Sequence, residues 1–106
     1  MKDETRFLWE LLVPRTMKGS KVTKKHHEIF DKFVYKFSNG LTIFPASKGS
    51  WASWTHGELV KEEVLPVRFI CTQKDLEKIG KFARKHYEQE AIFACLVSEK
   101  IFLFGK

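Results

Sequence analysis

The chain has 106 residues, 43% of them hydrophobic, and a net charge of +6. This size predicts one domain, residues 1–106, with one core and no room for a second. No apolar run approaches the ~20 residues of a membrane span and no signal peptide is evident, so we expect no membrane association. Cys71 and Cys95 lie in apolar runs, which favours buried free thiols in a reducing cytoplasm over a disulfide.

The positive charge would suit an anionic partner such as nucleic acid. The densest basic cluster consists of Lys18, Lys21, Lys24 and Lys25, beside the pair His26-His27. Other basic residues are dispersed along the chain. A solvated face at the start of a helix explains the cluster better than a phosphate-binding patch does, so we rank nucleic acid as an unlikely partner.

In chain order, the first predicted element is a strand at residues 7–13, which Pro14 ends. A loop at residues 15–22 follows. Thr23 then caps a first helix, which stops at Asn39-Gly40 in a left-handed turn. The apolar stripe of this helix consists of Ile29, Phe30, Phe33, Val34 and Phe37. A short strand at residues 41–44 and a loop or irregular hairpin at residues 48–57 complete the first half.

The second half begins with a long strand at about residues 59–71, in which Pro66 predicts an edge position or a bulge. Thr72 and Asp75 predict a capping box for a second helix. The buried stripe of that helix consists of Leu76, Ile79, Ala83 and Tyr87. Residues 91–97 are apolar on both faces, which predicts a central strand.

Residues 101–104 predict a last, very apolar strand, for which contact with another subunit is the economical cover. The order of the elements predicts an α+β, ferredoxin-like sandwich, with an antiparallel sheet, two helices on one face and an added C-terminal hairpin.

The segment between Lys48 and Glu63 is the richest in side chains that carry chemistry. They are Trp51, Trp54, His56, Glu58, Glu62 and Glu63. Indole rings stack on flat ligands, and carboxylates bind a cation or move a proton. Equally, each indole could be a hydrophobic plug and each acid a guard of an edge strand. Glu62 and Glu63 should face opposite sides of the strand, but a bulge near Pro66 would exchange the two faces.

Glu10 interrupts an apolar strand, either because its face is exposed or because its carboxylate points into a pocket that raises its pKa. Arg68 is a candidate for binding phosphate groups. No metal site is expected, because the adjacent residues His26-His27 project about 100° apart on a helix. His86 lies near the end of the second helix, where the helix dipole favours a cation. Without a glycine-rich nucleotide loop, no cofactor is expected either.

Several short motifs follow one another along the chain: Gly40-Leu41, Gly49-Ser50-Trp51, Glu62-Glu63, Val67-Arg68, Cys71 and Tyr87-Glu88-Gln89. In this order they resemble the small phage S-adenosylmethionine lyases, long called SAM hydrolases. The resemblance implies a trimer of PII-like, ferredoxin-type subunits with ligand in the clefts between neighbours. It assigns the acidic role to Glu62 or Glu63. It also places Trp51 where the family has a tyrosine, which keeps a stacking surface but removes the hydroxyl.

Three functions are consistent with these residues. The first is an S-adenosylmethionine lyase that releases methylthioadenosine and homoserine lactone, with the two acids as catalytic candidates. Its ligand-binding candidates are Trp51, Trp54, His56, Glu58, Arg68 and Glu10. The second is a non-catalytic protein that binds a nucleotide-like metabolite as a sensor or sponge. The third is a basic nucleic-acid-binding module. The pattern also resembles small bacterial and phage proteins for which no chemistry is implied.

Overall fold

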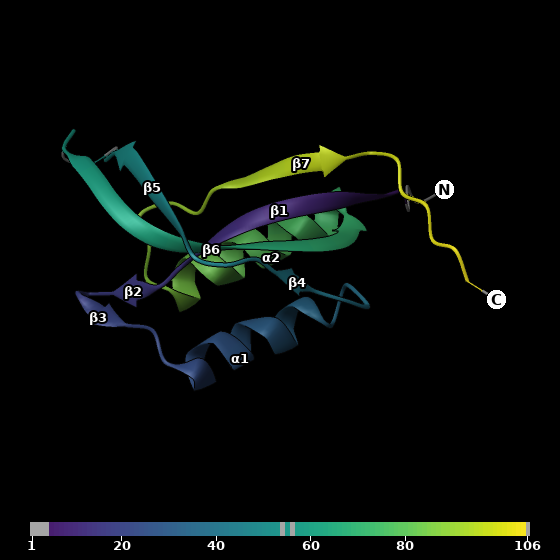
Figure 1. Ribbon diagram of the computed structural model, residues 1–106, viewed down its shortest axis with the longest axis horizontal. Coiled ribbons are helices and arrows are strands. Elements are labelled where there is room, and N and C mark those ends of the chain that lie inside the picture. Colours follow the sequence, from purple (N-terminus) through teal and green to yellow (C-terminus); the bar gives the residue numbers. More distant parts are fainter. Residues whose placement is uncertain (1–4, 54, 56, 106) are drawn as a thin grey trace.

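The computed structural model describes residues 5–53, 55 and 57–105. A twisted sheet has both helices on one side (Figure 1). The strands are β1 (Arg6–Pro14), β2 (Thr16–Met17), β3 (Ser20–Lys21), β4 (Thr42–Ile43), β5 (Ser47–Ala52), β6 (Leu59–Thr72) and β7 (Ala94–Ser98). The helices are α1 (Lys24–Val34) and α2 (Gln73–His86).

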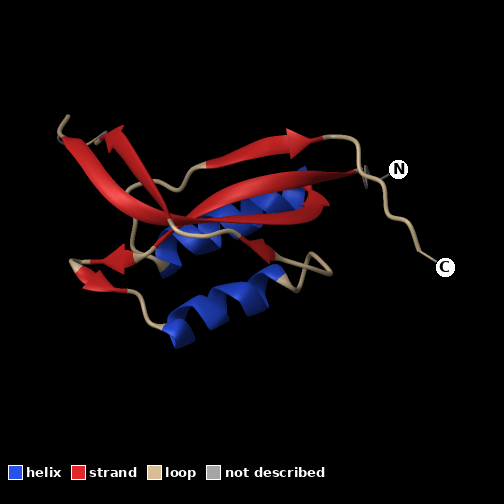
Figure 2. Cartoon of the chain, viewed as in Figure 1, coloured by secondary structure: helices blue, strands red, loops and turns tan. Residues whose placement is uncertain are grey.

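The main sheet has the strand order β4-β6-β1-β7, and β5 pairs with the part of β6 that extends beyond β4. All of these pairs are antiparallel. Helix α1 lies between β1 and β4 in the chain, and α2 lies between β6 and β7, so each helix connects two strands (Figure 2). This order confirms the predicted ferredoxin-like α+β sandwich.

The core lies between the two central strands and the helices. Strands β1 and β6 pair without interruption from Arg6 opposite Thr72 to Pro14 opposite Val64. Since side chains alternate along a strand, every second residue of each strand faces the helices. The buried residues on this face are Trp9, Leu11, Val13, Val67, Phe69 and Cys71.

Both predicted helix caps are confirmed. The Thr23 hydroxyl accepts a hydrogen bond from the backbone N–H of His26, and the Thr72 hydroxyl accepts one from Asp75, each at 3.1 Å. Each cap satisfies a backbone donor that the helix leaves free, which stabilises a protein by about 1 kcal/mol. The predicted stripe of α2 is also confirmed, with Ile79, Ala83 and Tyr87 buried and Leu76 partly buried.

The end of α1 was predicted wrongly. The helix stops at Val34, and the next four residues form hydrogen-bonded turns, in which Phe37 and Ser38 both donate to the Val34 carbonyl. Gly40 is not left-handed. Ile29 is 44% exposed, so the buried stripe is narrower than the pattern suggested.

The two helices are joined by a reciprocal pair of histidines. His26 Nε2 donates to the His86 carbonyl, and His86 Nε2 donates to the His26 carbonyl, both at 2.7 Å. Their rings stack with 3.6 Å between centroids. Both imidazoles therefore serve helix packing, which for His86 goes beyond the dipole role that its position in the sequence suggested.

Residues 15–22 are not an irregular loop. Strands β2 and β3 form a short hairpin there, which turns at Lys18 and Gly19 with φ angles of 49° and 78°. Glycine adopts this left-handed conformation without steric cost. Lys18 adopts the same conformation, and its ammonium forms an ion pair with Glu88 at 2.7 Å.

Pro66 occupies the central strand β6, not an edge. Proline has no backbone N–H to donate. Pro66 lies at the point along β6 where the adjacent strand changes from β4 to β5. The segment from Ile43 to Ser47 is one residue longer than the segment between their partners, Val67 and Val64. An irregularity therefore exists near Pro66, but it lies in the neighbouring chain segment and leaves the alternation of β6 intact.

The C-terminal region differs most from expectation. Strand β7 is at the edge of the sheet, with β1 as its neighbour, and is not central. Residues 101–104 form no strand, so the predicted hairpin is absent. Phe102, Leu103 and Phe104 are 74%, 88% and 95% exposed. In the described part of the chain, neither helix is both long and apolar enough to cross a bilayer.

Candidate functional site

The register of β5 against β6 selects one of the two candidate acids. Glu62 lies opposite Gly49, and Trp51 lies opposite Val60. Residues that face each other across a ladder share a side of the sheet, as do alternate residues of one strand. Trp51 and Glu62 therefore share the side of the sheet that carries no helix.

These two side chains contact each other directly. The indole Nε1–H of Trp51 donates to Glu62 Oε1 at 3.1 Å, and both residues are half-buried. They line a cavity of about 480 Å³, which we call the β5–β6 pocket. The remaining lining residues are Leu12, Pro14, Gly49, Ser50, Ala52, Val64, Gln89, Ala91, Ile92 and Phe93. A mostly apolar cavity of this size with a few polar groups is typical of small-molecule sites.

The far wall of the pocket is the segment that follows α2. Glu88 reverses the chain with a φ of 53°, and the Gln89 N–H donates to the Arg84 carbonyl at 3.0 Å. The Leu12 N–H then donates to the Phe93 carbonyl at 3.0 Å, which fastens this wall to β1. Backbone hydrogen bonds at both ends thus fix the wall relative to the sheet.

Glu90 positions the wall of the pocket, a role that the sequence did not indicate. Its carboxylate accepts hydrogen bonds from Ser53 Oγ at 2.9 Å, from the Thr55 backbone N–H at 2.6 Å and from Thr55 Oγ1 at 2.8 Å. It therefore holds the connection between β5 and β6 against the segment after α2. No local pattern could reveal this contact, because Thr55 and Glu90 are 35 residues apart in the chain.

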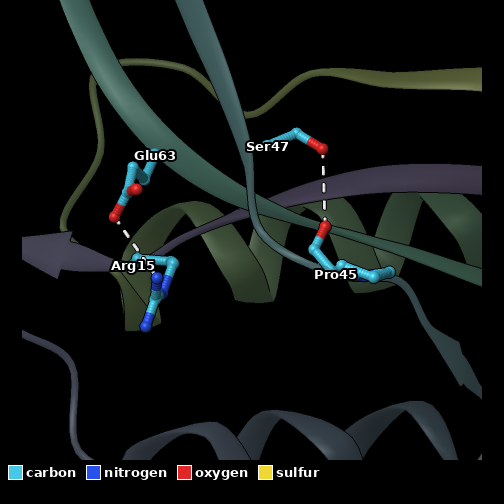
Figure 3. Close-up of polar contacts among 4 residues, drawn as sticks. All are labelled: Arg15, Pro45, Ser47 and Glu63. Carbon is cyan, nitrogen blue, oxygen red and sulfur yellow. Dashed lines mark hydrogen bonds and ion pairs between the residues drawn. The ribbon is translucent and has the colours of Figure 1, made fainter.

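Glu63 faces the other side of β6. Its carboxylate forms an ion pair with Arg15 at 3.2 Å, as Figure 3 shows, and its side chain is 54% exposed. The Arg15 backbone N–H also donates to the Glu63 carbonyl at 3.1 Å. The same view includes the hydrogen bond from Ser47 Oγ to the Pro45 carbonyl, at 3.4 Å, where β5 begins.

The remaining predicted residues lie elsewhere. Glu10 and Arg68 are opposite each other on β1 and β6 and form an ion pair at 3.0 Å. The Arg68 guanidinium also lies 4.8 Å from the centroid of the Phe44 ring. Neither charged residue lines the β5–β6 pocket. Glu58 is exposed at the end of the β5–β6 connection. Trp54 and His56 fall outside the described residues, and their roles stay predictions.

The chemistry that this arrangement offers is recognition of a flat, partly apolar ligand with a cationic or hydrogen-bonding group. The indole supplies a surface for stacking, and Glu62 supplies a carboxylate beside it. Among the residues that the structure describes, no three His, Cys, Asp or Glu side chains are placed to hold a metal ion.

The order of strands and helices defines a ferredoxin-like α+β fold of the PII-like type. No protein-family profile matches the sequence, and no curated protein matches it significantly. Among solved structures, it is similar to a phage SAM lyase in complex with S-methyl-5'-thioadenosine. The TM-score is 0.66 at 13% identity, and the match covers 93% of this chain and 85% of that one.

Two CutA proteins are also similar. CutA1 from the psychrotrophic bacterium Shewanella sp. SIB1 has a TM-score of 0.64 at 14% identity, over 98% of this chain and 89% of that chain. The periplasmic divalent cation tolerance protein CutA from Archaeoglobus fulgidus has a TM-score of 0.63 at 11% identity, over 92% and 87%. At these identities the similarity establishes the fold, which confirms the predicted distant resemblance to phage SAM lyases and PII-like proteins.

Proposed function

We propose that the β5–β6 pocket binds a nucleoside-type metabolite, with S-adenosylmethionine as the first candidate. The observation that carries the proposal is the pairing of the Trp51 indole with the Glu62 carboxylate inside a largely apolar cavity of about 480 Å³. A purine can stack on the indole, and the carboxylate can bind the ammonium or sulfonium part of the ligand. The phage SAM lyase of similar fold binds a methylthio nucleoside, which supports this ligand class.

As a lyase, the protein would need little chemistry of its own. The ligand's own carboxylate oxygen attacks the γ-carbon, a C–O bond forms, and the C–S bond breaks with its electron pair on sulfur. The products are methylthioadenosine and homoserine lactone, and no proton has to move. Catalysis then consists of folding the substrate into the reactive conformation, for which Glu62 would hold the amine. In this proposal Glu62 is the catalytic candidate.

Binding without turnover is the second candidate function. One observation favours it: an oxygen of Glu62 already accepts the indole N–H of Trp51, at 3.1 Å. Tryptophan also lacks the hydroxyl that the lyase family carries at this position, so the pocket offers stacking without that hydrogen-bonding group beside the ligand. A sensor or sponge for the same metabolite requires only this stacking surface and the carboxylate.

We also propose that another copy of the chain completes the pocket, in a homotrimer as the family resemblance implies. The exposed apolar residues support this proposal, because Phe93 in the pocket wall is 59% exposed and Leu59 is 65% exposed. The C-terminal residues Phe102, Leu103 and Phe104 are more exposed still. A run of adjacent exposed apolar residues, as at the C-terminus, is typical of an interface. Cys71 and Cys95 are free thiols, which suits a cytoplasmic protein.

The test combines binding and turnover on the full chain. We expect S-adenosylmethionine and methylthioadenosine each to raise the melting temperature, and Trp51→Ala and Glu62→Gln to abolish the shift. Glu63→Gln is the matched control, because Glu63 is adjacent in β6 but faces the other side. Mass spectrometry of the incubated mixture then separates the two functions: methylthioadenosine supports the lyase, and intact ligand supports the binder. The absence of any shift with either compound would reject both.

Native mass spectrometry tests the assembly. A trimer that retains ligand is the expected species, and a monomer at micromolar concentration would contradict the shared pocket.

A further inference from the structure

A second cavity, of about 570 Å³, lies on the opposite side of the sheet, beneath α1. We call it the α1 cavity. Its floor is apolar and consists of Val13, Leu65, Val67, Val22, Phe30 and Ile43. It shares no lining residue with the β5–β6 pocket, because the floor residues of β1 and β6 alternate with those of that pocket. The function proposed above makes no use of it.

One polar group of this cavity is the imidazole of His27, which is hydrogen-bonded to a tyrosine. His27 Nδ1 lies 2.8 Å from the hydroxyl of Tyr87, which is fully buried. Burial, and then the Asp31 carboxylate, raise the pKa of Tyr87, so its hydroxyl keeps its proton and can donate it to His27 Nδ1. Burial, and then the neighbouring His26, lower the pKa of His27. When Nδ1 of the neutral ring accepts from Tyr87, Nε2–H is the donor that the ring can offer a ligand.

The acidic groups lie on α1 as well. Asp31 is half-buried, and burial followed by the charge of Glu28 raises the pKa of Asp31. Glu28 is one turn earlier, so the two carboxylates share a face of the helix. Neither forms an ion pair with any residue in the described ranges. A desolvated carboxylate without a cationic partner is costly, and a bound ammonium group would relieve that cost.

The basic groups line the same cavity where β3 leads into α1. Lys21 ends β3 and Lys24 begins α1, and both line the α1 cavity. Within the described part of the chain, neither ammonium forms an ion pair or a hydrogen bond through its side chain. Arg15 also lines the cavity, but its guanidinium pairs with Glu63. The α1 cavity thus combines two unpaired carboxylates, two unpaired ammonium groups, an imidazole N–H donor and an apolar floor.

We propose that the α1 cavity binds a free amino acid with an aliphatic side chain. The ammonium of the ligand pairs with Asp31 and Glu28. Its carboxylate pairs with Lys21 and Lys24 and accepts from His27 Nε2–H. Its side chain packs on the floor of the cavity. A purely anionic ligand would meet the two acids, and a purely cationic one would meet the two lysines, so a zwitterion matches both kinds of group.

The experiment is isothermal titration calorimetry of the full chain with three probes of one shape. L-leucine carries both charges, 4-methylpentanoate lacks the ammonium, and 3-methylbutylamine lacks the carboxylate. We expect L-leucine to bind, and each analogue to bind at least about tenfold more weakly, because each loses a charge-assisted hydrogen bond. No heat from L-leucine at millimolar concentration, or equal affinity for either analogue, would overturn the proposal.

Two variants locate the binding. Asp31→Asn keeps the shape of the side chain and removes its charge, and it should weaken L-leucine binding by about tenfold or more. Glu77→Gln is the control, because Glu77 is exposed on α2 and does not line the α1 cavity. Circular dichroism verifies that both variants are folded. If Asp31→Asn binds L-leucine as tightly as the unchanged protein does, the ammonium site assigned to α1 is refuted.

Discussion

The two halves of β6 have opposite surroundings. The core half, Val64–Thr72, has β1 along its full length and β4 on its other side, and it buries Val67, Phe69 and Cys71. The arm, Leu59–Glu63, pairs with β5 and extends beyond the helices (Figure 1). None of the five arm residues is fully buried. One strand thus carries the stability of the fold in its core half and the candidate site in its arm.

The difference explains why one continuous strand can serve both purposes. Hydrophobic burial scales with the apolar area removed from water, and the core half removes most of it. The arm buries less apolar area and includes polar contacts such as that of Trp51 with Glu62. Substitutions in the core half should therefore unfold the protein, whereas substitutions in the arm should alter binding and leave the fold intact.

The largest expected effect is at Phe69. Its side chain is 2% exposed in the centre of the core, so Phe69→Ala should lower the free energy of unfolding by about 3–5 kcal/mol. Urea denaturation followed by tryptophan fluorescence measures the change. Val60→Ala, in the arm, is the comparison and should cost less than about 1.5 kcal/mol, since Val60 is only half-buried. Similar costs for the two variants would break the distinction between core half and arm.

A smaller effect is expected at Glu90, which fastens the connection at the end of the arm. Glu90→Gln replaces a charged acceptor with a neutral one, and charged hydrogen bonds are worth about 1.5–3 kcal/mol each. The Thr55 amide, which donates to Glu90 at 2.6 Å, should then exchange its hydrogen at least about tenfold faster. Amides of the core half, such as that of Phe69, serve as the internal control and should keep their protection.

The pH dependence of stability tests how well the core half buries Cys71. Burial raises the pKa of Cys71, in the core half, to about 12 from its ordinary value of 9.0. Below pH 9 the thiol is neutral in both states and its contribution to stability is complete. As the pH rises from 9 toward 12, the unfolded chain ionises first, so the free energy of unfolding falls. Cys71→Ala should therefore make the loss of stability in this range less steep.

Thiol labelling gives a second measure of the same burial. Cys95 on β7 is half-buried and should react with a thiol reagent in the native protein. Cys71 should react only when the protein unfolds, because the thiolate is the nucleophile and burial suppresses it. Equal rates for the two cysteines in the native state would show that the core half opens readily.

Hydrophobic periodicity predicted the elements that make up the core. Hydrophobic spacing predicted the strands at residues 7–13 and 59–71 and the second helix, because each of them buries a regular face. The two threonine caps were predicted from their positions just before the helices. For residues 91–97 the same reasoning gave a wrong prediction. Apolar residues on both faces are typical of a central strand, but β7 is an edge strand whose Leu96 and Val97 stay exposed in the single chain.

The candidate site could be predicted only in part. The sequence drew attention to Trp51, Glu62 and Glu63, because indoles and acids are concentrated there. It could not choose between the two acids, since the choice depends on the register of β5 and on whether Pro66 shifts the alternation of β6. Glu90 and the α1 cavity were beyond reach, because each arises from segments that meet only in the folded chain.

The smallest expected effect distinguishes the two faces of the arm. Glu63→Gln removes an ion pair with Arg15 whose side chains are 30% and 54% exposed, so it should lower the free energy of unfolding by less than about 1 kcal/mol. The backbone hydrogen bond from Arg15 to the Glu63 carbonyl does not depend on the side chain and holds the strands together. Urea denaturation at low and high salt measures the change, and the small effect should vanish at high salt.

Glu62→Gln is the matched variant on the pocket face. Its half-buried carboxylate accepts the indole N–H of Trp51, so salt should screen this contact less and the cost should persist at high salt. If instead Glu63→Gln proved the costlier change at high salt, the face that carries Arg15 would be the more constrained one. The assignment of the buried, site-forming face to Trp51 and Glu62 would then have to be reversed.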